Sequence, residues 1–390
     1  MARRPSHRSA QQNLLIPRGD GKVSAVSLPA QLPSVLRIHE VAERAGVSVA
    51  TVSRAFNLPD KVAPATRERV ERVAQELGYL PNASARTLRT QRSRVLGVVL
   101  PTLLNPVFAE CLQGVAAAAA VGSYAIVPMT TAYDEAQELR TVAQLMAANV
   151  DGLVLVVSNP ARSQALQRLR AAARPYVLAY SAHPEHPCVS VDGEGAAAEV
   201  VRQLAALGHQ RIAMVSGTLS ASDRAQQRYR GYLRGMADAG LAVLPVVEVP
   251  FVDNAVQSLA RYLDAAPRPT ALFCSNDLLA VRCIRAARLQ GLRVPEDLAV
   301  VGFDGIAIGE ELTPTLSTVV QPNGDMGRLA VQLLLKSIAR ARLPDARDSL
   351  CLPHSLRWSE SSAGPAPTWA HTVFTEPIPT LSHHGGNHEI

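Results

Sequence analysis

Residues 50–54, ATVSR, carry side chains whose chemistry suits the recognition of DNA bases. An alanine offers a small apolar surface to a thymine methyl group, and a threonine or serine hydroxyl can hydrogen-bond to a base edge. The guanidinium of Arg54 can make two parallel hydrogen bonds to guanine, the commonest base-specific contact. These residues predict a base-reading segment, provided that one helix presents Ala50, Thr51, Ser53 and Arg54 on its outer face.

The stretch LRIHEVAERAGVSVATVSRAFN, residues 36–57, predicts such a helix and a shorter one before it. Gly46 stands where two helices that meet at a steep angle need a left-handed residue in a tight turn. Ser48 can cap the second helix, because its side chain can accept a hydrogen bond from the first turn. The buried face of this helix is expected to be Val49, Val52 and Phe56. The pattern indicates a helix-turn-helix, whose second helix enters the DNA major groove. A small helical pair with solvated polar residues is the alternative.

Two further segments complete the N-terminal part. A third helix is expected to begin at Pro64 and to end at Gly78, with an apolar stripe formed by Val70, Val73, Ala74 and Leu77. The segment PNASARTLR, residues 81–89, can form a short helix capped by Asn82, but it has no apolar stripe and should become ordered only on a partner. Leu88 could then insert between base pairs in the minor groove. A plain interdomain linker is an equal alternative.

From Val95 onward, short apolar runs alternate with amphipathic stretches. The runs that predict strands are VLGVVL, YAIVPMT, GLVLVV, YVLAY, RIAMVSG, ALFCS and AVVGF. The stretches that predict helices are Val107 to Ala120, Ala136 to Ala147, Ala196 to Leu207, Tyr229 to Ala239, Leu278 to Leu289 and Met326 to Ala339. Such alternation is typical of α/β proteins with parallel sheets covered by helices. About 260 residues are too many for one open sheet, so we expect two doubly wound lobes.

Ligands of such sheets bind beyond the carboxyl ends of the strands. The loops at these ends carry Asn105 to Phe108, Tyr180-Ser181, Asp223 to Arg228, Asn276-Asp277 and Gly302 to Gly305. Aromatic, arginine, amide and carboxylate side chains that face one cleft suit a small hydroxylated ligand. Each residue alone is weak evidence, because an aspartate after a strand is more often a helix cap.

The positive charge is concentrated at the N-terminal end. Residues 1–94 hold 16 Lys and Arg against 7 Asp and Glu, a balance of +9, whereas the rest hold 23 against 26, a balance of −3. A basic head on a near-neutral body fits phosphate binding, although a basic disordered tail would give the same sign.

Several classes of protein are disfavoured by what the sequence lacks. No apolar run is long enough to span a membrane, and no secretory signal is recognisable. The five scattered cysteines favour a reducing cytoplasm, where we expect the protein near the nucleoid. A Gly-rich phosphate loop, a G-x-S-x-G elbow and paired metal-ligand spacings are also absent. We therefore expect neither an enzyme nor a bound metal or cofactor.

Five segments resemble the lac repressor/gal repressor (LacI/GalR) family of bacterial transcription regulators. They are RIHEVAERAGVSVATVSRAFN, GYLPNASARTLRT, RPTALFCSNDLLA, GLRVPEDLAVVGFDG and LTPTLSTVVQP, and the resemblance covers about residues 36–360. It implies a dimer, often a tetramer, that reads a palindromic operator in double-stranded DNA. It also implies a small-molecule effector held between two periplasmic-binding-protein-like lobes. No tetramerising leucine heptad follows Trp358, which favours a homodimer.

The resemblance also implies roles for individual residues. It places Val49, Ala50 and Arg54 among the base-reading positions, and Ala85 and Leu88 in a minor-groove hinge helix. The candidate DNA-contacting residues are Ser48, Val49, Ala50, Thr51, Ser53, Arg54, Asn57, Asn82, Ala85, Arg86 and Leu88. In the cleft between the lobes it places Phe108, Arg228, Asn276 and Asp304, with Phe251 as an aromatic wall.

The effector is expected to be an acid. Tyr180 stands where several sugar-binding members have an acidic residue, and Arg224 and Arg228, four residues apart, share a helix face whose N-terminus favours anions. NPVFAE and the arginine pair also resemble gluconate-utilisation repressors, so a sugar acid such as gluconate is favoured over a purine or a neutral sugar. Asp223 and Asp304 could instead neutralise the arginines. The candidate effector-binding residues are Phe108, Tyr180, Arg224, Arg228, Phe251, Asn276 and Asp304.

Five regions are expected along the chain. They are a disordered basic extension (1–35), a helix-turn-helix domain (36–80), a hinge helix or linker (81–94), a two-lobed domain (95–361) and a disordered tail (362–390). Lobe 1 should comprise about 95–192 and 321–350, and lobe 2 about 193–320 and 351–361. The predicted function is a ligand-responsive repressor of a carbohydrate or sugar-acid operon. A periplasmic-type sugar carrier without a regulatory role is the alternative.

Overall fold

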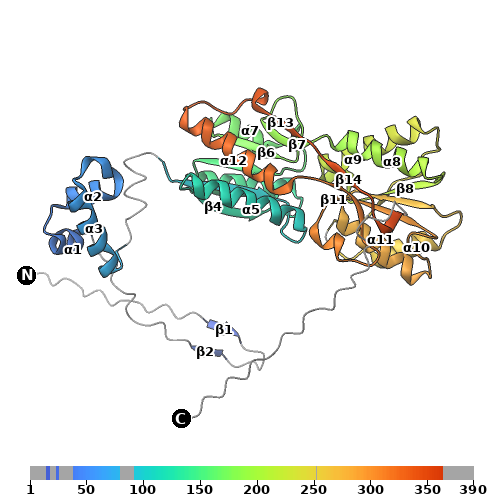
Figure 1. Cartoon of the computed structure of the whole chain (residues 1–390), viewed down its shortest axis with the longest axis horizontal. Helices are drawn as coiled ribbons and strands as arrows, with labels where there is room; N and C mark the ends of the chain where they lie inside the picture. The colour runs from blue at the N-terminus through green and yellow to red at the C-terminus, as the bar shows by residue number, and fades with distance from the viewer. Residues whose placement is uncertain (1–14, 18–22, 26–37, 80–91, 252, 363–390) are drawn as a thin grey trace, which may run out of the picture. The chain divides into compact units, whose positions relative to one another are not determined.

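The computed structural model describes residues 15–17, 23–25, 38–79, 92–251 and 253–362 (Figure 1). They fall into two compact units, one within residues 1–91 and the other within 92–390. The predicted hinge residues Asn82, Ala85, Arg86 and Leu88 lie outside the described residues, as does the tail from 363 onward. None of the helices in the described ranges is long and apolar enough to cross a membrane.

The N-terminal extension departs from the expectation of no regular structure. Leu15–Pro17 (β1) and Val23–Ala25 (β2) pair as two short antiparallel strands. Each strand is only three residues long, which is too short to create a periodic pattern in the sequence.

Three helices form the head: α1 Ile38–Ala45, α2 Val49–Asn57 and α3 Pro64–Leu77. Gly46 has a φ of 63° in the turn between α1 and α2, which confirms the predicted left-handed residue. The small core contains Val41, Ala42, Ala45, Val52, Ala55, Val70, Val73, Ala74 and Tyr79. The predicted buried face of α2 is wrong in part, because Ala55 is buried whereas Val49 and Phe56 are only half-buried at the edge of this core.

Lobe 1 is built on a fully parallel sheet with the strand order β13-β7-β6-β5-β3-β4. Its strands are β3 Val95–Leu100, β4 Ala125–Thr130, β5 Gly152–Leu155, β6 Tyr176–Ala179, β7 Cys188–Val191 and β13 Leu350–Leu352. Its helices are α5 Pro106–Val121, α6 Glu135–Ala147, α7 Gln164–Ala171 and α12 Asn323–Ala339. Two apolar cores result, because α5 and α12 cover one face of the sheet and α6 and α7 cover the other.

Lobe 2 repeats this plan with the strand order β14-β12-β11-β10-β8-β9, in which only β14 is antiparallel to its neighbour. Its strands are β8 Ile212–Ser216, β9 Val247–Glu248, β10 Ala271–Cys274, β11 Ala299–Asp304, β12 Ser317–Val320 and β14 Ser355–Arg357. Its helices are α8 Gly193–Ala206, α9 Asp223–Asp238, α10 Val256–Asp264 and α11 Asp277–Leu289. Here α8 and α9 cover one face, and α10 and α11 cover the other.

Some element boundaries differ from the prediction. Helix α9 begins at Asp223 rather than Tyr229, because Ser222 caps a first turn made of polar residues that give no apolar signal. The short elements β7, β9, β12, β13, β14, α7 and α10 are absent from the predicted set. The predicted lobe boundary at 350/351 is also wrong, since Cys351 and Leu352 pair with β7 of lobe 1 before the chain enters β14.

Candidate functional site

The second helix of the head, α2, presents the predicted DNA-reading residues. Its cap is Ser48, whose Oγ accepts a hydrogen bond from Thr51 N at 3.1 Å and lies 2.9 Å from Thr51 Oγ1. This interaction helps to hold the first turn of α2, because Ser48 Oγ adds a second acceptor for Thr51 N, which also donates to Ser48 O at 2.9 Å. The predicted cap is therefore confirmed.

The candidate residues on α2 differ in exposure. Ala50 and Arg54 are exposed, whereas Thr51 and Ser53 are half-buried. Asn57 is also half-buried, and its Nδ2 donates to Ser53 O at 2.7 Å within the same helix. Arg54 is therefore the long cationic side chain that α2 presents to solvent, whereas the Asn57 side chain is held by its own backbone.

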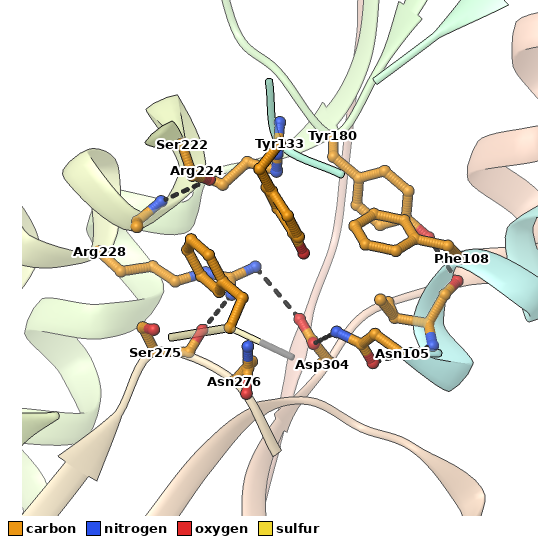
Figure 2. Close-up of a pocket in the computed structure, with 13 residues that line it drawn as sticks. Asn105, Phe108, Tyr133, Tyr180, Ser222, Arg224, Arg228, Ser275, Asn276 and Asp304 are labelled. Carbon is orange, nitrogen blue, oxygen red and sulfur yellow. Dashed lines mark hydrogen bonds and ion pairs between the residues drawn. The ribbon is translucent and has the colours of Figure 1, made fainter. Parts of the chain in front are cut away.

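A pocket lies between the two lobes (Figure 2). All seven candidate effector residues line it: Phe108, Tyr180, Arg224, Arg228, Phe251, Asn276 and Asp304. They come from loops and helix starts beyond the carboxyl ends of parallel strands in both sheets, which is where ligands of such sheets bind. The structure therefore brings the predicted residues together in one place.

Arg228 and Asp304 form the charged centre of the pocket. Arg228 Nη2 lies 3.2 Å from Asp304 Oδ1, and its Nη1 donates to Ser275 O (Figure 2). The guanidinium also lies over the Phe303 ring, with Cζ 3.7 Å from the ring centroid. Both residues are buried, so each is stabilised as an ion mainly by the other.

Asp304 also accepts two amide hydrogen bonds. Asn105, which belongs to lobe 1, donates from Nδ2 to Asp304 Oδ2 at 3.3 Å. Gln321 donates from Nε2 to Asp304 Oδ1 at 3.0 Å. The pKa of Asp304 is raised to about 7, mainly by burial and also by the nearby carboxylate of Asp277, against the lowering effect of Arg228. The backbone of Asp304 has a φ of 127°, a strained conformation for a residue with a side chain. Such strain is typical of functional sites.

Arg224 is paired differently from the expectation of a free cation. Its Nη1 donates to Val157 O of lobe 1 at 2.8 Å and to Asp223 Oδ1 at 2.8 Å. Its other terminal nitrogen, Nη2, is buried and has no hydrogen-bond partner in the described parts of the chain. Both arginines have a carboxylate partner, as in the alternative in which Asp223 and Asp304 neutralise them. One N–H group of Arg224 nevertheless remains available to an acceptor in the pocket.

Tyr180 contributes its ring rather than its hydroxyl. The hydroxyl lies 2.9 Å from Val107 O and 3.3 Å from Asn323 Oδ1, which accept from it. Complete burial raises the pKa of Tyr180 well above its usual value, so it stays neutral. Its ring meets Phe108 edge to face, with centroids 5.7 Å apart. Tyr180 thus presents a neutral apolar wall to the pocket.

Two aromatic rings from opposite lobes close one side of the pocket. Tyr133, which follows β4 in lobe 1, stacks on Phe251, which follows β9 in lobe 2, with centroids 4.5 Å apart and an interplanar angle of 13°. Gly217 lies under Phe251, and a Cβ atom there would come within 2.1 Å of the ring. The absence of a side chain at Gly217 therefore lets this ring reach Tyr133.

Sequence reasoning missed three residues that line the pocket: Tyr133, Ser222 and Ser275. Asn105, Val107 and Ala225 lie in loops that the sequence placed at the cleft, but they were not among the candidate effector residues. A signal for Tyr133 and Ser275 exists, because each follows the carboxyl end of a predicted strand. Asn105 caps α5 and also reaches Asp304, so its role as a helix cap hides its role in the pocket.

The chemistry that this pocket offers is binding. It combines aromatic walls with amide, hydroxyl and guanidinium donors and one carboxylate acceptor, an arrangement that suits a small polar ligand. Within the described residues, no group of three or more His, Cys, Asp and Glu side chains is placed to hold a metal ion.

Comparisons with known proteins agree with this two-part organisation. Residues 37–82 match the family described as bacterial regulatory proteins, lacI family, and residues 201–362 match the periplasmic binding protein-like domain. Catabolite control protein A of Priestia megaterium is 33% identical over 330 residues, which cover 83% of this chain and 98% of that protein. The HTH-type transcriptional repressor CytR of Escherichia coli (strain K12) is 35% identical over 301 residues, which cover 76% of this chain and 88% of that protein.

A solved structure supports the same conclusion. The structure of the Lac repressor dimer bound to operator and the anti-inducer ONPF matches with a TM-score of 0.75 and 28% sequence identity. The match covers 84% of this chain and 99% of the Lac repressor chain. The relatives are transcriptional regulators rather than enzymes, and they match the head as well as both lobes. The chain therefore belongs to the lacI family of bacterial DNA-binding transcription regulators.

Proposed function

We propose that this protein is a ligand-responsive repressor that binds a palindromic operator as a homodimer and controls the use of a carbohydrate or sugar acid. One observation carries the proposal: the seven candidate effector residues, from both lobes, line a single pocket in a chain that also has a helix-turn-helix. A periplasmic-type carrier would share the two lobes but would have no use for α2 and its exposed Arg54. We expect the protein to act in the cytoplasm, at the nucleoid.

A second copy of the chain has a suitable surface on lobe 1. Strand β4 is an edge strand that pairs with β3 on one side. Val127 on β4 is 41% exposed, and Val121 at the end of α5 is 90% exposed. An exposed edge with apolar side chains is commonly covered by another chain, which supports a homodimer. The Lac repressor structure is a dimer on its operator, which supports the same proposal.

The proposed mechanism is a change in the arrangement of the lobes. Direct bonds already join them across the pocket, because Asp223 N donates to Ser158 O at 2.7 Å and Asn105 Nδ2 donates to Asp304 Oδ2 at 3.3 Å. A ligand that prefers this closed arrangement would hold the lobes together and thereby change the spacing of the two hinge segments in the dimer. It can alter operator affinity only through such a difference in affinity for the two arrangements.

We further propose that the effector is a sugar acid such as gluconate. The support is the buried Nη2 of Arg224, which has no partner in the described parts of the chain and can donate to a carboxylate. The neutral ring of Tyr180 also leaves this side of the pocket without a negative charge. Asp304 then remains as the acceptor for a ligand hydroxyl.

The test is calorimetric titration of the full chain with gluconate, related sugar acids, neutral hexoses and purines. We expect a sugar acid to bind most tightly, and Arg224→Ala to weaken it by about tenfold or more, since a charge-assisted hydrogen bond contributes about 1.5–3 kcal/mol. Arg230→Ala is the matched control, because Arg230 lies on the same helix but pairs with Glu194 on the surface. Micromolar binding of a neutral sugar that Arg224→Ala leaves unchanged would overturn the acid proposal.

A purine or a neutral sugar is the second candidate. The observation in its favour is that Arg228 and Arg224 are each neutralised by an aspartate, while Phe108, Tyr133 and Phe251 offer flat apolar faces. A planar base would stack on such rings. In the same titration, binding of a purine that is lost in Phe251→Ala but kept in Arg224→Ala would establish this alternative.

A further inference from the structure

The chain enters lobe 1 through residues 92–95, the junction, and one carboxylate fastens this junction to the lobe. Asp151, directly before β5, accepts at Oδ1 from Ser93 N at 2.7 Å and from Ser93 Oγ at 2.9 Å. Its Oδ2 accepts a third hydrogen bond, from Arg94 N at 3.1 Å. Asp151 N in turn donates to Val95 O at 2.8 Å. The side chain and the backbone of Asp151 therefore both hold the junction on the sheet of lobe 1.

The backbone of the junction is strained. Arg94 has a φ of 58°, in the left-handed region that a residue with a side chain rarely adopts. Such a conformation persists only where the surrounding bonds outweigh its cost. The bond from Arg94 N to Asp151 is one of these, and Ala125 N donates to Arg94 O at 2.9 Å. Without the Asp151 carboxylate, we expect the junction to relax and to move relative to lobe 1.

Two arginines attach the junction to the carboxyl ends of two helices. Arg92 Nη2 donates to Ile338 O, in the last turn of α12, at 3.0 Å. Arg94 Nη1 donates to Gly122 O, at the cap of α5, at 3.1 Å. Carbonyl groups at the carboxyl end of a helix have no partner within the helix, and a cation is favourable there. The junction is therefore bonded to the ends of both α5 and α12.

The amino ends of the same two helices lie at the pocket. Asn105 caps α5 and donates to Asp304, and Phe108 in the first turn of α5 lines the pocket. Helix α12 begins at Asn323, whose Nδ2 donates to Asp304 O at 3.1 Å. Since α5 has 16 residues and α12 has 17, each helix spans about 25 Å from the pocket to the junction.

Helices α5 and α12 lie side by side, with their backbones in direct contact (Figure 1). A Cβ atom at Gly114 of α5 would collide with Gly324 O of α12, and one at Gly327 of α12 would collide with Cys111 O of α5. Such close packing leaves no space in which a displacement of one helix could be absorbed. A shift of the helices at the pocket should therefore also move their carboxyl ends, and the junction is bonded to those ends.

We propose that Asp151 is a positioning residue for the control of operator binding. By holding the junction on lobe 1, it lets a movement of α5 and α12 reach residues 81–91, which lead to the head. Asp151 is not among the residues that line the pocket, so it acts through Ser93 and Arg94 rather than on the ligand. The inference deepens the proposed function and rests on it, because it requires that the lobes control operator binding.

The experiment measures how far a change in the lobes shifts operator affinity in the full chain. The DNA probe is a duplex that the wild-type protein selects from a random pool. One perturbation of the lobes is the tightest-binding compound among gluconate, neutral hexoses and purines. The other is Arg162→Ala, which removes a bond between the lobes and needs no ligand. Fluorescence anisotropy gives the ratio of operator affinities with and without each perturbation, and we expect at least about fivefold for the compound on the wild type.

Asp151→Ala should bring both ratios to within about twofold of one, because the junction no longer follows the helices. Calorimetry should give a ligand affinity within about twofold of the wild type, since the pocket is distant. Asp345→Ala is the matched control, because Asp345 also accepts from a backbone N–H in lobe 1, but its partner is Arg347 rather than the junction.

A milder variant keeps the test independent of folding. Ser93→Ala removes the Ser93 hydroxyl but leaves both backbone bonds to Asp151 in place, so its ratios should lie between those of the wild type and Asp151→Ala. Circular dichroism will check that each variant is folded. If Asp151→Ala does not fold, a wild-type ratio in Ser93→Ala overturns the inference.

The outcomes separate this inference from the proposed function. If Asp151→Ala keeps the wild-type ratios, the inference is wrong and the proposed function stands. Operator binding that is weakened equally with and without the perturbations would also overturn the inference, because Asp151 would then support DNA binding and not its control. If neither perturbation shifts the operator affinity of the wild type, control by the lobes is wrong, and the inference is wrong with it.

Discussion

Asp304 is the residue through which pH should act on ligand binding. It faces Arg228 directly, and Tyr133, Tyr180 and Asp277 are further titratable groups near it. Its pKa of about 7 means that its negative charge is lost as the pH falls from 8 to 6. An anionic ligand would raise this pKa further, so binding the anion takes up a proton. Protonation of Asp304 thus strengthens the binding of an acidic ligand. It weakens the binding of a neutral sugar, because the carboxylate no longer accepts a hydrogen bond from a sugar hydroxyl.

We therefore predict that the affinity for a sugar acid rises as the pH is lowered from 8 to 6, by up to about tenfold for each unit by which the ligand shifts the pKa. Calorimetry at several pH values, in buffers of different ionisation enthalpy, will measure both the affinity and the proton uptake. Asp304→Asn should flatten the profile. An affinity that falls on acidification would contradict the prediction.

Arg54 is the residue on which sequence-specific DNA reading should depend most. It is exposed on α2, where a guanidinium can reach a guanine edge. Arg54→Ala should weaken operator binding by about 1–3 kcal/mol and relax the preference at one base pair, because a bidentate contact is lost. Fluorescence anisotropy with operator variants will measure both effects. Arg72→Ala on α3 is the matched exposed control. Equal weakening on operator and on random DNA would make Arg54 a phosphate contact.

The residue types of the site could be predicted from the sequence better than their pairing. Asn276 and Asp304 follow predicted strands and belong to motifs that resemble the family, so their place at the cleft is foreseeable. Neutralisation of the arginines by Asp223 and Asp304 could be named only as an alternative, because Arg228 and Asp304 are far apart in the sequence and their pairing depends on how the strands are ordered in the sheet. Likewise, the Tyr180 hydroxyl is engaged by Val107 O only once β6 and α5 are in place.

At the scale of elements, the apolar periodicity of the sequence predicts the strands and helices that contribute most to the buried cores. The seven predicted apolar runs all contain strands of the two sheets, and six of these strands are central and buried on both faces, whereas β4 is an edge strand. Short edge elements such as β13 and β14 are only partly buried and have no continuous apolar run. The start of α9 was missed for a related reason, since its first turn faces a polar pocket rather than an apolar core. Polar residues that line a pocket at the carboxyl ends of strands thus replace the apolar residues that would otherwise predict where a helix begins.

The hinge segment, residues 81–94, should act as a separate element that serves only the DNA complex. Leu88→Ala should weaken operator binding and reduce operator bending, because the side chain that would insert between base pairs is shortened. Effector affinity should stay within twofold of the wild type, since the lobes that form the pocket begin at β3. Circular-permutation gel shifts will report the bend angle, and calorimetry will report effector binding. A wild-type bend angle together with wild-type affinity would contradict the minor-groove role of Leu88.

At the scale of the whole molecule, the excess positive charge belongs to the sequence segments that flank the head rather than to the head itself. Residues 38–79 contain six Lys and Arg and six Asp and Glu, so the excess of +9 through Arg94 comes from residues 1–37 and 80–94. Phosphate attraction should therefore depend on the flanking segments, whereas base reading depends on α2. Affinity for DNA in general and specificity for the operator should therefore depend on different segments of the chain.

The two lobes are joined by contacts outside the pocket, and these allow coupling to be tested without touching the ligand. Arg162 of lobe 1 donates to Ser220 O of lobe 2 at 3.1 Å and pairs with Glu135 of its own lobe at 2.8 Å. Removing this side chain should destabilise the closed arrangement by about 0.2–1 kcal/mol, the range for an exposed pair. Arg170→Ala is the matched control, because Arg170 pairs with Glu185 within lobe 1.

A ligand that stabilises closure and a substitution that opposes it must shift operator affinity in opposite directions. We predict that Arg162→Ala changes operator affinity of the ligand-free protein by up to about fivefold, with a sign opposite to the effect of the ligand on the wild type. Linkage further requires that the ligand changes operator affinity by the same factor as the operator changes ligand affinity. Anisotropy titrations of operator with and without ligand, and calorimetry of ligand with and without operator, will measure both factors. If Arg162→Ala shifts operator affinity in the same direction as the ligand, or no more than Arg170→Ala does, closure of the lobes is not what the operator detects.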